Sequence, residues 1–299
     1  MQVWQLQEKT WELVSHWKVA GMPSHMAWSH PESGRLLAVA GQDGEVTFWE
    51  APVHARSAAP TGEGLHYRHL SSLRCSTGRP IRQVLFAPVQ LGLIVVAASD
   101  DGCVHMFEAD TVMSPREWTL QSKLQVGPMG QQPSLCWRPF STGTAPMLAA
   151  ACGPSVQIWQ HDLAHLKWKL HAELQSSSRQ PICCLDWAPA MGRPVELLAA
   201  GSGSCADVFV LSRDEGGSSS SGGGGGGVVG ELYEALQHQG AVWKVEWDLL
   251  GISLAVGTDA QRVYVWRADL AGVWRTTSLL EGDASASFGG EDDMRDEEE

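Results

Sequence analysis

The sequence contains no asparagine, so it has no acceptor for N-linked glycosylation. Its seven cysteines are odd in number and form no CxxC pair, which argues against a disulfide framework. No apolar run approaches the roughly 18 residues needed to span a bilayer. The amino-terminal stretch MQVWQLQEKTW also lacks the features of a signal peptide. These absences predict a soluble intracellular protein whose thiols are reduced and mostly buried in strands.

Basic residues are also scarce. The chain has 21 Lys and Arg against 34 Asp and Glu, a net charge of −13. With no basic stripe, direct binding to nucleic acid is disfavoured. Residues 281–299 contain nine acidic side chains and one arginine. A charge run of this kind predicts a solvated, disordered acidic tail over 282–299.

Tryptophan, by contrast, is abundant, with 14 copies, and it is regularly spaced. Five times an aromatic residue is followed 19 to 22 positions later by a second one that closes an alternating apolar run. The pairs are Trp28 with Trp49, Phe86 with Phe107, Trp137 with Trp159, Trp187 with Phe209, and Trp247 with Trp266. A sixth closing aromatic is Trp4, and successive closing residues lie 45 to 58 positions apart. This period predicts repeated supersecondary units.

Each repeat contains four predicted strands. In the third unit they span 81–86, 93–99, 103–107 and 116–124, and in the last unit 241–247, 252–258, 262–266 and 272–280. Short strands at this spacing, separated by Gly, Asp and Pro turns, indicate all-β structure, and four strands per unit is the blade of a β-propeller. We therefore predict one WD-repeat β-propeller over 1–281. Insertions at 51–65 and 212–230 interrupt it, and the second, rich in Gly and Ser, is expected to be flexible.

The blade count predicts an open, six-bladed ring. Residues 2–4 and 11–18 supply only the third and fourth strands of a first blade, and five complete blades follow. Either the reading frame begins at an internal methionine or the opening strands are missing; we favour the first explanation. Unpaired strand edges are templates for added strands. The residues expected to face a partner are Gln2, Val3, Trp4, Tyr264, Trp266 and Trp274.

Three segments resemble one family. AWSHPESGRLLAVAGQDGEVTFWE (27–50), FAPVQLGLIVVAASDDGCVHMFEADTVMSPREWTLQ (86–121) and HQGAVWKVEWDLLGISLAVGTDAQRVYVWRADLAGVWR (238–275) are similar to blades of the WD-repeat nucleoporins of the Sec-thirteen homologue family. That resemblance implies an open propeller that receives a blade in trans from a larger helical nucleoporin. It also implies a non-enzymatic scaffold subunit of the Y-shaped nuclear pore subcomplex, supporting protein and mRNA transport, without cofactor or membrane insertion.

The resemblance leaves alternatives for the assembly. A vesicle-coat subunit of the Sec-thirteen type shares the HPE and AP turns, but FEADTVMSPREWTLQ resembles the nucleoporin branch. The family also serves in a vacuole- or lysosome-associated complex that regulates TOR signalling. The expected location is accordingly the nucleus and nuclear envelope, with a cytoplasmic or vacuole- and lysosome-associated pool as the alternative.

Residues that could suggest chemistry are better explained by the architecture. Asp43 and Asp101 occupy predicted turns, where aspartate bonds its own backbone. Trp4, Trp49, Trp159 and Trp266 are expected to pack between blades as aromatic anchors. His238 is predicted to hydrogen-bond toward Asp259 and Trp266, which would hold the last blade together.

No catalytic, cofactor or metal site is predicted. The inner strands offer only Asp186 and Glu246 as isolated carboxylates, which is too little for an enzyme. His161 and His165 have HxxxH spacing but lie in a predicted loop without a third ligand. Cys183 and Cys184 are adjacent on an inner strand and are expected to be buried or half-buried.

Overall fold

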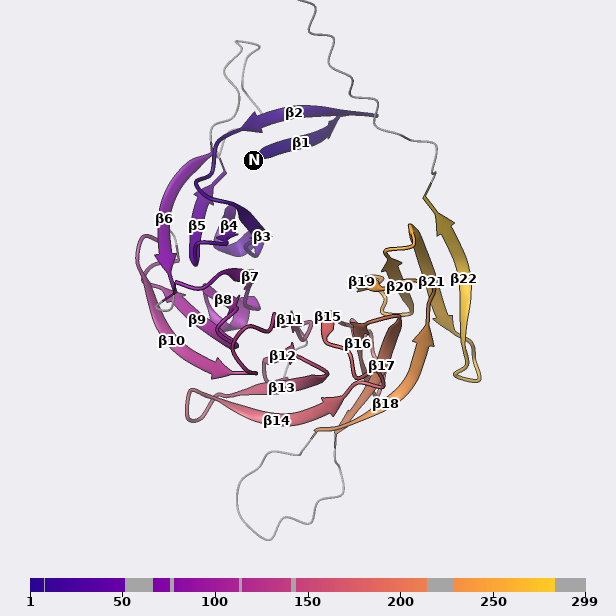
Figure 1. The fold of residues 1–299 in the computed structure, drawn as a ribbon. Helices are drawn as coiled ribbons and strands as arrows, with labels where there is room; N and C mark the ends of the chain where they lie inside the picture. Colours follow the sequence, from indigo (N-terminus) through magenta and orange to yellow (C-terminus); the bar gives the residue numbers. More distant parts are fainter. Residues whose placement is uncertain are drawn as a thin grey trace, which may run out of the picture.

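The computed structural model describes residues 1–7, 9–51, 67–75, 78–112, 115–140, 144–213 and 228–282. Twenty-two strands form five four-stranded antiparallel sheets and one two-stranded sheet. Figure 1 shows the sheets arranged as blades around a ring, with the first strand of each four-stranded sheet nearest the centre. The predicted all-β propeller is confirmed. The middle of both insertions and the acidic tail lie outside the described residues.

The two-stranded sheet consists of β1 (Gln2–Gln7) and β2 (Thr10–His16). The first four-stranded sheet contains β3 (Pro23–Trp28), β4 (Leu36–Gly41), β5 (Glu45–Glu50) and β6 (Arg68–Arg74). The next contains β7 (Ile81–Phe86), β8 (Ile94–Ser99), β9 (Cys103–Ala109) and β10 (Trp118–Gln125). The third contains β11 (Ser134–Trp137), β12 (Met147–Cys152), β13 (Ser155–Asp162) and β14 (Lys167–Gln175).

The fourth sheet contains β15 (Ile182–Trp187), β16 (Glu196–Ser202), β17 (Cys205–Arg213) and β18 (Val228–Gln237). The last contains β19 (Val242–Trp247), β20 (Ser253–Thr258), β21 (Arg262–Ala268) and β22 (Trp274–Glu281). Two single 3-10 turns, η1 (Pro31–Ser33) and η2 (Val89–Leu91), follow the inner strands β3 and β7. Within the parts of the chain that the structure describes, no helix has the length and apolar character to cross a bilayer.

The core lies between blades rather than inside one of them. Four clusters of buried apolar side chains each span one pair of neighbouring four-stranded sheets. In blades that have a neighbour on each side, the second strand, such as IVVAAS of β8 or MLAAAC of β12, is buried on both faces. Small and β-branched residues suit this position, since two sheets can then approach closely.

The outer two strands of every blade share one irregularity. In every four-stranded sheet the fourth strand carries one extra residue, a β-bulge, opposite the closing aromatic and the residue before it on β5, β9, β13, β17 and β21. The same bulge occurs in β2, where Val14 is the extra residue opposite Val3 and Trp4 of β1. Because a bulge bends and twists the strand that carries it, its recurrence at one position is a reproducible structural marker. The pair β1–β2 is therefore equivalent to the outer half of a blade.

Candidate functional site

The predicted turn aspartates lie at the ends of hairpins. Asp43 Oδ1 accepts a hydrogen bond from the backbone N of Glu45 at 3.2 Å, and Asp101 Oδ1 accepts one from Cys103 N at 3.0 Å. Asp101 is buried, and its Oδ2 lies 3.0 Å from His105 Nε2 and 3.3 Å from Lys123 Nζ. Asp101 thus connects its own turn to the two outer strands of the blade.

For both His105 and Asp101, burial shifts the pKa in one direction and hydrogen bonding shifts it in the other. Burial lowers the pKa of His105, and the bond to Asp101 offsets only part of that effect. For Asp101, burial disfavours the charge, but hydrogen bonds from Cys103 and His105 leave its pKa lowered. The neutral His105 ring therefore donates to an ionised Asp101 carboxylate, an arrangement that stabilises the blade.

His238 is hydrogen-bonded to one of its two predicted partners. Trp266 Nε1 donates to His238 Nε2 at 2.9 Å, and burial lowers the histidine pKa, which keeps this acceptor nitrogen unprotonated. Asp259 Oδ1 instead accepts from the backbone N of Ala241 at 2.6 Å. The structure therefore brings His238 and Trp266 together, while Asp259, in the turn between β20 and β21, bonds the backbone just before β19.

The closing tryptophans share a local bond to a side chain two residues earlier. Trp49 Nε1 donates to Thr47 Oγ1 at 3.0 Å, and Trp159 Nε1 donates to Gln157 Oε1 at 3.2 Å. Both rings are half-buried. Trp4 Nε1 makes the same kind of bond to Gln2 Oε1, at 3.3 Å.

Trp4 nevertheless differs from the other closing tryptophans, because 49% of its surface is exposed. The prediction that it packs between blades is wrong for this residue. The four described apolar clusters between sheets involve only the four-stranded sheets, so the β1–β2 pair does not share in them.

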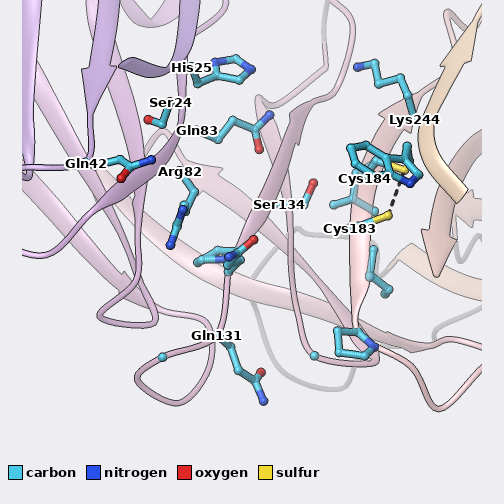
Figure 2. A pocket seen from close by; sticks show the side chains of 18 of the residues that line it. Ser24, His25, Gln42, Arg82, Gln83, Gln131, Ser134, Cys183, Cys184 and Lys244 are labelled. Atoms are coloured by element: carbon cyan, nitrogen blue, oxygen red, sulfur yellow. Dashed lines mark hydrogen bonds between the residues drawn. The ribbon is translucent and has the colours of Figure 1, made fainter. Parts of the chain in front are cut away.

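A polar cavity of about 760 Å³ lies at the centre of the ring, between the inner strands. Figure 2 shows Ser24, His25, Arg82, Gln83, Ser134, Cys183 and Lys244 around it. Arg82 is paired with Asp100 at 2.8 Å. Among the described residues, no three His, Cys, Asp or Glu side chains are grouped so that they could hold a metal ion.

Cys183 corrects the expectation of buried thiols. Cys75, Cys103, Cys136, Cys152, Cys184 and Cys205 are buried, but Cys183 is exposed, because strand alternation turns its side chain toward the central cavity. Its Sγ lies 3.0 Å from Val242 O and 3.3 Å from Gly201 O. The Cys184 Sγ lies 3.6 Å away, and hydrogen bonding with it lowers the pKa of Cys183 although burial opposes this effect.

In each of the last two sheets, one face is turned away from the preceding sheet, and the solvent exposure of this face differs between the two sheets at matched positions. In the fourth sheet, the side chains that face the last sheet are buried, with exposures of 0 to 3%. They are Ala199, Ala206, Val208 and Leu236. The residues in the same register of the last sheet are Ala255, Val263, Val265 and Leu280. Of these, Val263 is 37% exposed and Leu280 is 58% exposed. The last blade therefore presents an apolar face without a covering sheet among the described residues; we call it the open face.

Three predicted partner-facing residues lie on the opposite side of the last sheet. Tyr264 and Trp266 pack against the core shared with the fourth sheet, and Trp274 is buried there against Trp247, with ring centroids 5.8 Å apart. The prediction is wrong for these residues because side chains alternate between faces along a strand. The open face is formed by their neighbours Val263 and Val265.

The other end of the series also exposes apolar side chains. Of the three residues of β1 that the sequence suggested would face a partner, Gln2 and Trp4 are exposed and Val3 is half-buried. The exposed side chains on β1 and β2 include Leu6, Trp11 and Leu13. In Figure 1, β1–β2 and β19–β22 are the first and last sheets of the ring, so both exposed surfaces lie at the ends of the series.

The sequence draws attention to Asp186 and Glu246, but it did not predict the structural role of Asp186. Trp247 N donates to Asp186 Oδ2 at 2.6 Å, and Trp247 Nε1 donates to the Asp186 carbonyl at 3.2 Å. Asp186 thus fastens the inner strand β15 to the backbone of β19. A signal for this role was available, since a carboxylate on an otherwise apolar inner strand needs a hydrogen-bond donor.

Comparison with known proteins shows that no family model matches the chain. The chain is 28% identical over 295 residues to nucleoporin SEH1 of Bos taurus, covering 95% of this chain and 80% of that protein. Nucleoporin SEH1 of Homo sapiens is 27% identical over the same coverage. Protein SEH1 of Arabidopsis thaliana is 27% identical over 275 residues, which is 86% of this chain and 80% of that protein. The predicted resemblance to WD-repeat nucleoporins is confirmed.

Proposed function

We propose that this chain is a non-enzymatic scaffold subunit of the nuclear pore complex that works by accepting strands from another nucleoporin. The observation that carries the proposal is the open face of β19–β22, where Val263 and Leu280 are exposed at positions that are buried in the preceding sheet. The partner is a larger helical nucleoporin of the Y-shaped subcomplex. Its donated strands would form a blade against this face.

The energetics favour insertion of a blade over a loose surface contact. Burying apolar surface contributes about 25 cal/mol per Å², and a blade-sized sheet would cover the open face from the inner strand to the rim. Each backbone hydrogen bond gained adds only about 0.5–1.5 kcal/mol. The inter-blade clusters within the chain are formed by the same kinds of side chain, Val, Ala and Leu. A partner sheet would extend this packing by one further unit.

The nucleoporin names of the relatives support the pore assignment and a structural role rather than catalysis. The chain would act at the nuclear envelope in protein and mRNA transport. It would bind other subunits of the Y-shaped subcomplex but not nucleic acid or the membrane interior.

Co-expression with the amino-terminal segment of the larger helical nucleoporin tests the proposal. A stable one-to-one pair is expected, and Val263→Asp with Leu280→Asp should abolish it. The matched control is Leu170→Asp, an exposed leucine on the outer strand β14, which should leave the pair intact. If the wild-type chain forms no stoichiometric pair, the proposed function is wrong.

A fluorescent tag distinguishes the assemblies that share this architecture. Labelling of the nuclear rim is the expected result. Labelling confined to endoplasmic-reticulum exit sites would assign the chain to a vesicle coat. Labelling confined to vacuoles or lysosomes would assign it to the TOR-regulating complex.

A further inference from the structure

Neighbouring inner strands are joined by side chains that bind the backbone of the next strand. Gln83 of β7 makes two such bonds to Leu135 of β11: its Nε2 donates to Leu135 O at 2.9 Å, and its Oε1 accepts from Leu135 N at 2.8 Å. Gln83 lies three residues before the aromatic end of its strand, and Leu135 lies two residues before the end of the next. The bonds therefore recognise main-chain atoms and not a side chain.

The same position is used at two other joints. At these joints the equivalent backbone group acts on the pKa of the side chain in this position: Val84 raises the pKa of His25 on β3, and Val245 lowers that of Cys184 on β15, although burial outweighs the first effect and burial with the Cys183 bond outweighs the second. His25 and Cys184 are three residues before the end of their strands, like Gln83. At three of the four joints between the five inner strands, the side chain three residues before the strand end therefore lies near the same backbone position of the next strand, although the side chains are an imidazole, an amide and a thiol.

Asp186 adds a second backbone contact at the joint between β15 and β19. It lies one residue before the end of β15, and its Oδ2 accepts from Trp247 N, the last residue of β19. The two contacts of this joint therefore reach residues two positions apart on the next strand, Val245 and Trp247. Such a pair of contacts defines both the direction and the register of the strand that it holds.

Lys244 and Glu246 occupy these two positions on β19, the last inner strand. Lys244 is opposite Gly257, as Cys184 is opposite Gly201. Glu246 is opposite Ala255, as Asp186 is opposite Ala199. Both charged side chains are exposed. Figure 2 shows Lys244 at the central cavity, among residues from the preceding inner strands.

We propose that Lys244 and Glu246 hold the main chain of the first strand of the incoming blade. Lys244, which can only donate, would bind the carbonyl oxygen two residues before the end of that strand. The ionised Glu246, which can only accept, would bind the N–H of its last residue. This inference rests on the proposed function, because it takes the partner to be a β-sheet of another protein. The pair selects a strand by direction and register, while the apolar open face supplies the buried area.

The test uses the full chain and the amino-terminal segment of the larger helical nucleoporin, with affinity measured by titration calorimetry. Lys244→Met and Glu246→Leu should each weaken binding by about 10-fold or more, since each removes a charge-assisted hydrogen bond. The matched controls are Lys167→Met and Glu173→Leu on the exposed outer strand β14, which should stay within about twofold of the wild-type chain.

A charge exchange separates backbone recognition from general electrostatic attraction. The double variant Lys244→Glu with Glu246→Lys keeps the net charge, but it places an acceptor where a donor is needed and the reverse. We expect it to bind at least as weakly as either single variant. Glu246→Gln, which is nearly isosteric, gives a second measurement at that position. Thermal unfolding of each variant alone should match the wild-type chain, because both side chains are exposed.

Three results would overturn the inference. If the wild-type chain binds the segment and the variants or the charge exchange bind equally well, the roles assigned to Lys244 and Glu246 are wrong and the proposed function stands. If the wild-type chain does not bind the segment, both are wrong. If the chain alone dimerises through this face, and Lys244→Met with Glu246→Leu dissociates the dimer in sedimentation, the occupant is a second copy and the partner is misassigned.

Discussion

The fourth and last sheets each have four strands paired in the same register, yet within the described residues only the fourth is covered by a sheet on both faces. Val208 of β17 is fully buried by the last sheet, whereas Val265 at the matched position of β21 is half-buried. Asp186 bonds the backbone of a neighbouring strand, whereas Glu246 at its matched position is exposed. Similar residues in matched positions therefore differ in what covers them. The open face is built like an interface between blades.

The largest expected effect separates the two valines. Val208→Asp places an unpaired charge between packed sheets and should cost about 3–5 kcal/mol of unfolding free energy, or prevent folding. Val265→Asp on the open face should cost about 1 kcal/mol, since water can reach the new carboxylate. Urea unfolding measures both. Equal losses would mean that the open face is covered in solution.

A smaller effect is expected for the two inner-strand carboxylates. Asp186→Leu leaves the N–H of Trp247 without its acceptor and should cost about 1–3 kcal/mol. Glu246→Leu removes an exposed side chain and should stay within about 0.5 kcal/mol of the wild-type chain in isolation. Urea unfolding again decides, and a stability loss for Glu246→Leu as large as for Asp186→Leu would break the comparison.

Acidification should weaken the covered regions. Burial lowers the pKa of His105 and of His25, which lies at the joint between β3 and β7. A histidine whose pKa is lower in the folded state stabilises the fold above about pH 6.5, and this contribution is lost as the pH falls below that value. The thermal midpoint should therefore decrease from pH 7.5 to 5.5.

His105→Gln is the control for this pH dependence. It removes one titrating group and should flatten the profile. The contribution of Asp101, whose pKa is lowered, is lost only at more acidic pH, below its ordinary range near 4. A midpoint that rises on acidification would contradict the assignment of neutral histidines.

The smallest expected effect is chemical and leaves stability unchanged. Cys183 is exposed to the central cavity, whereas hydrogen bonding to Cys183 and burial raise the pKa of Cys184 beside it. An aromatic disulfide reagent should modify one thiol per native chain rapidly. Cys183→Ser should abolish this reaction, and Cys184→Ser should not. Rapid labelling of several thiols would show that the interfaces between blades open readily.

The sequence was a good guide to strands and a poor guide to faces. The span 81–86 coincides with β7, and most other predicted strands begin or end within two residues of the observed bounds, because the closing aromatics and the turn residues mark the ends. The partner-facing assignment of Tyr264, Trp266 and Trp274 failed for a physical reason. Alternation separates Tyr264 from Val263, but it does not say which of the two faces the neighbouring blade covers.

The candidate site was only partly accessible from the sequence for a related reason. Lys244 and Glu246 are two charged residues on a short inner strand. When the inner strands are aligned by their terminal aromatics, these two residues occupy the positions equivalent to Cys184 and Asp186. Their significance required the observed bonds of Gln83 and Asp186, since long-range hydrogen bonds leave no periodic signal. The covering of one blade by the next is a property of the ring and not of a single repeat.

The joints between inner strands have an evolutionary consequence. A side chain that contacts only peptide groups does not depend on the identity of the residue it meets, so these bonds can form with a duplicated, shuffled or foreign unit without a compensating substitution at the contact. The hydrogen bonds at one junction do not depend on how many blades precede it. The curvature of the ring then sets the number of blades, and one blade can be encoded by the gene of a partner protein.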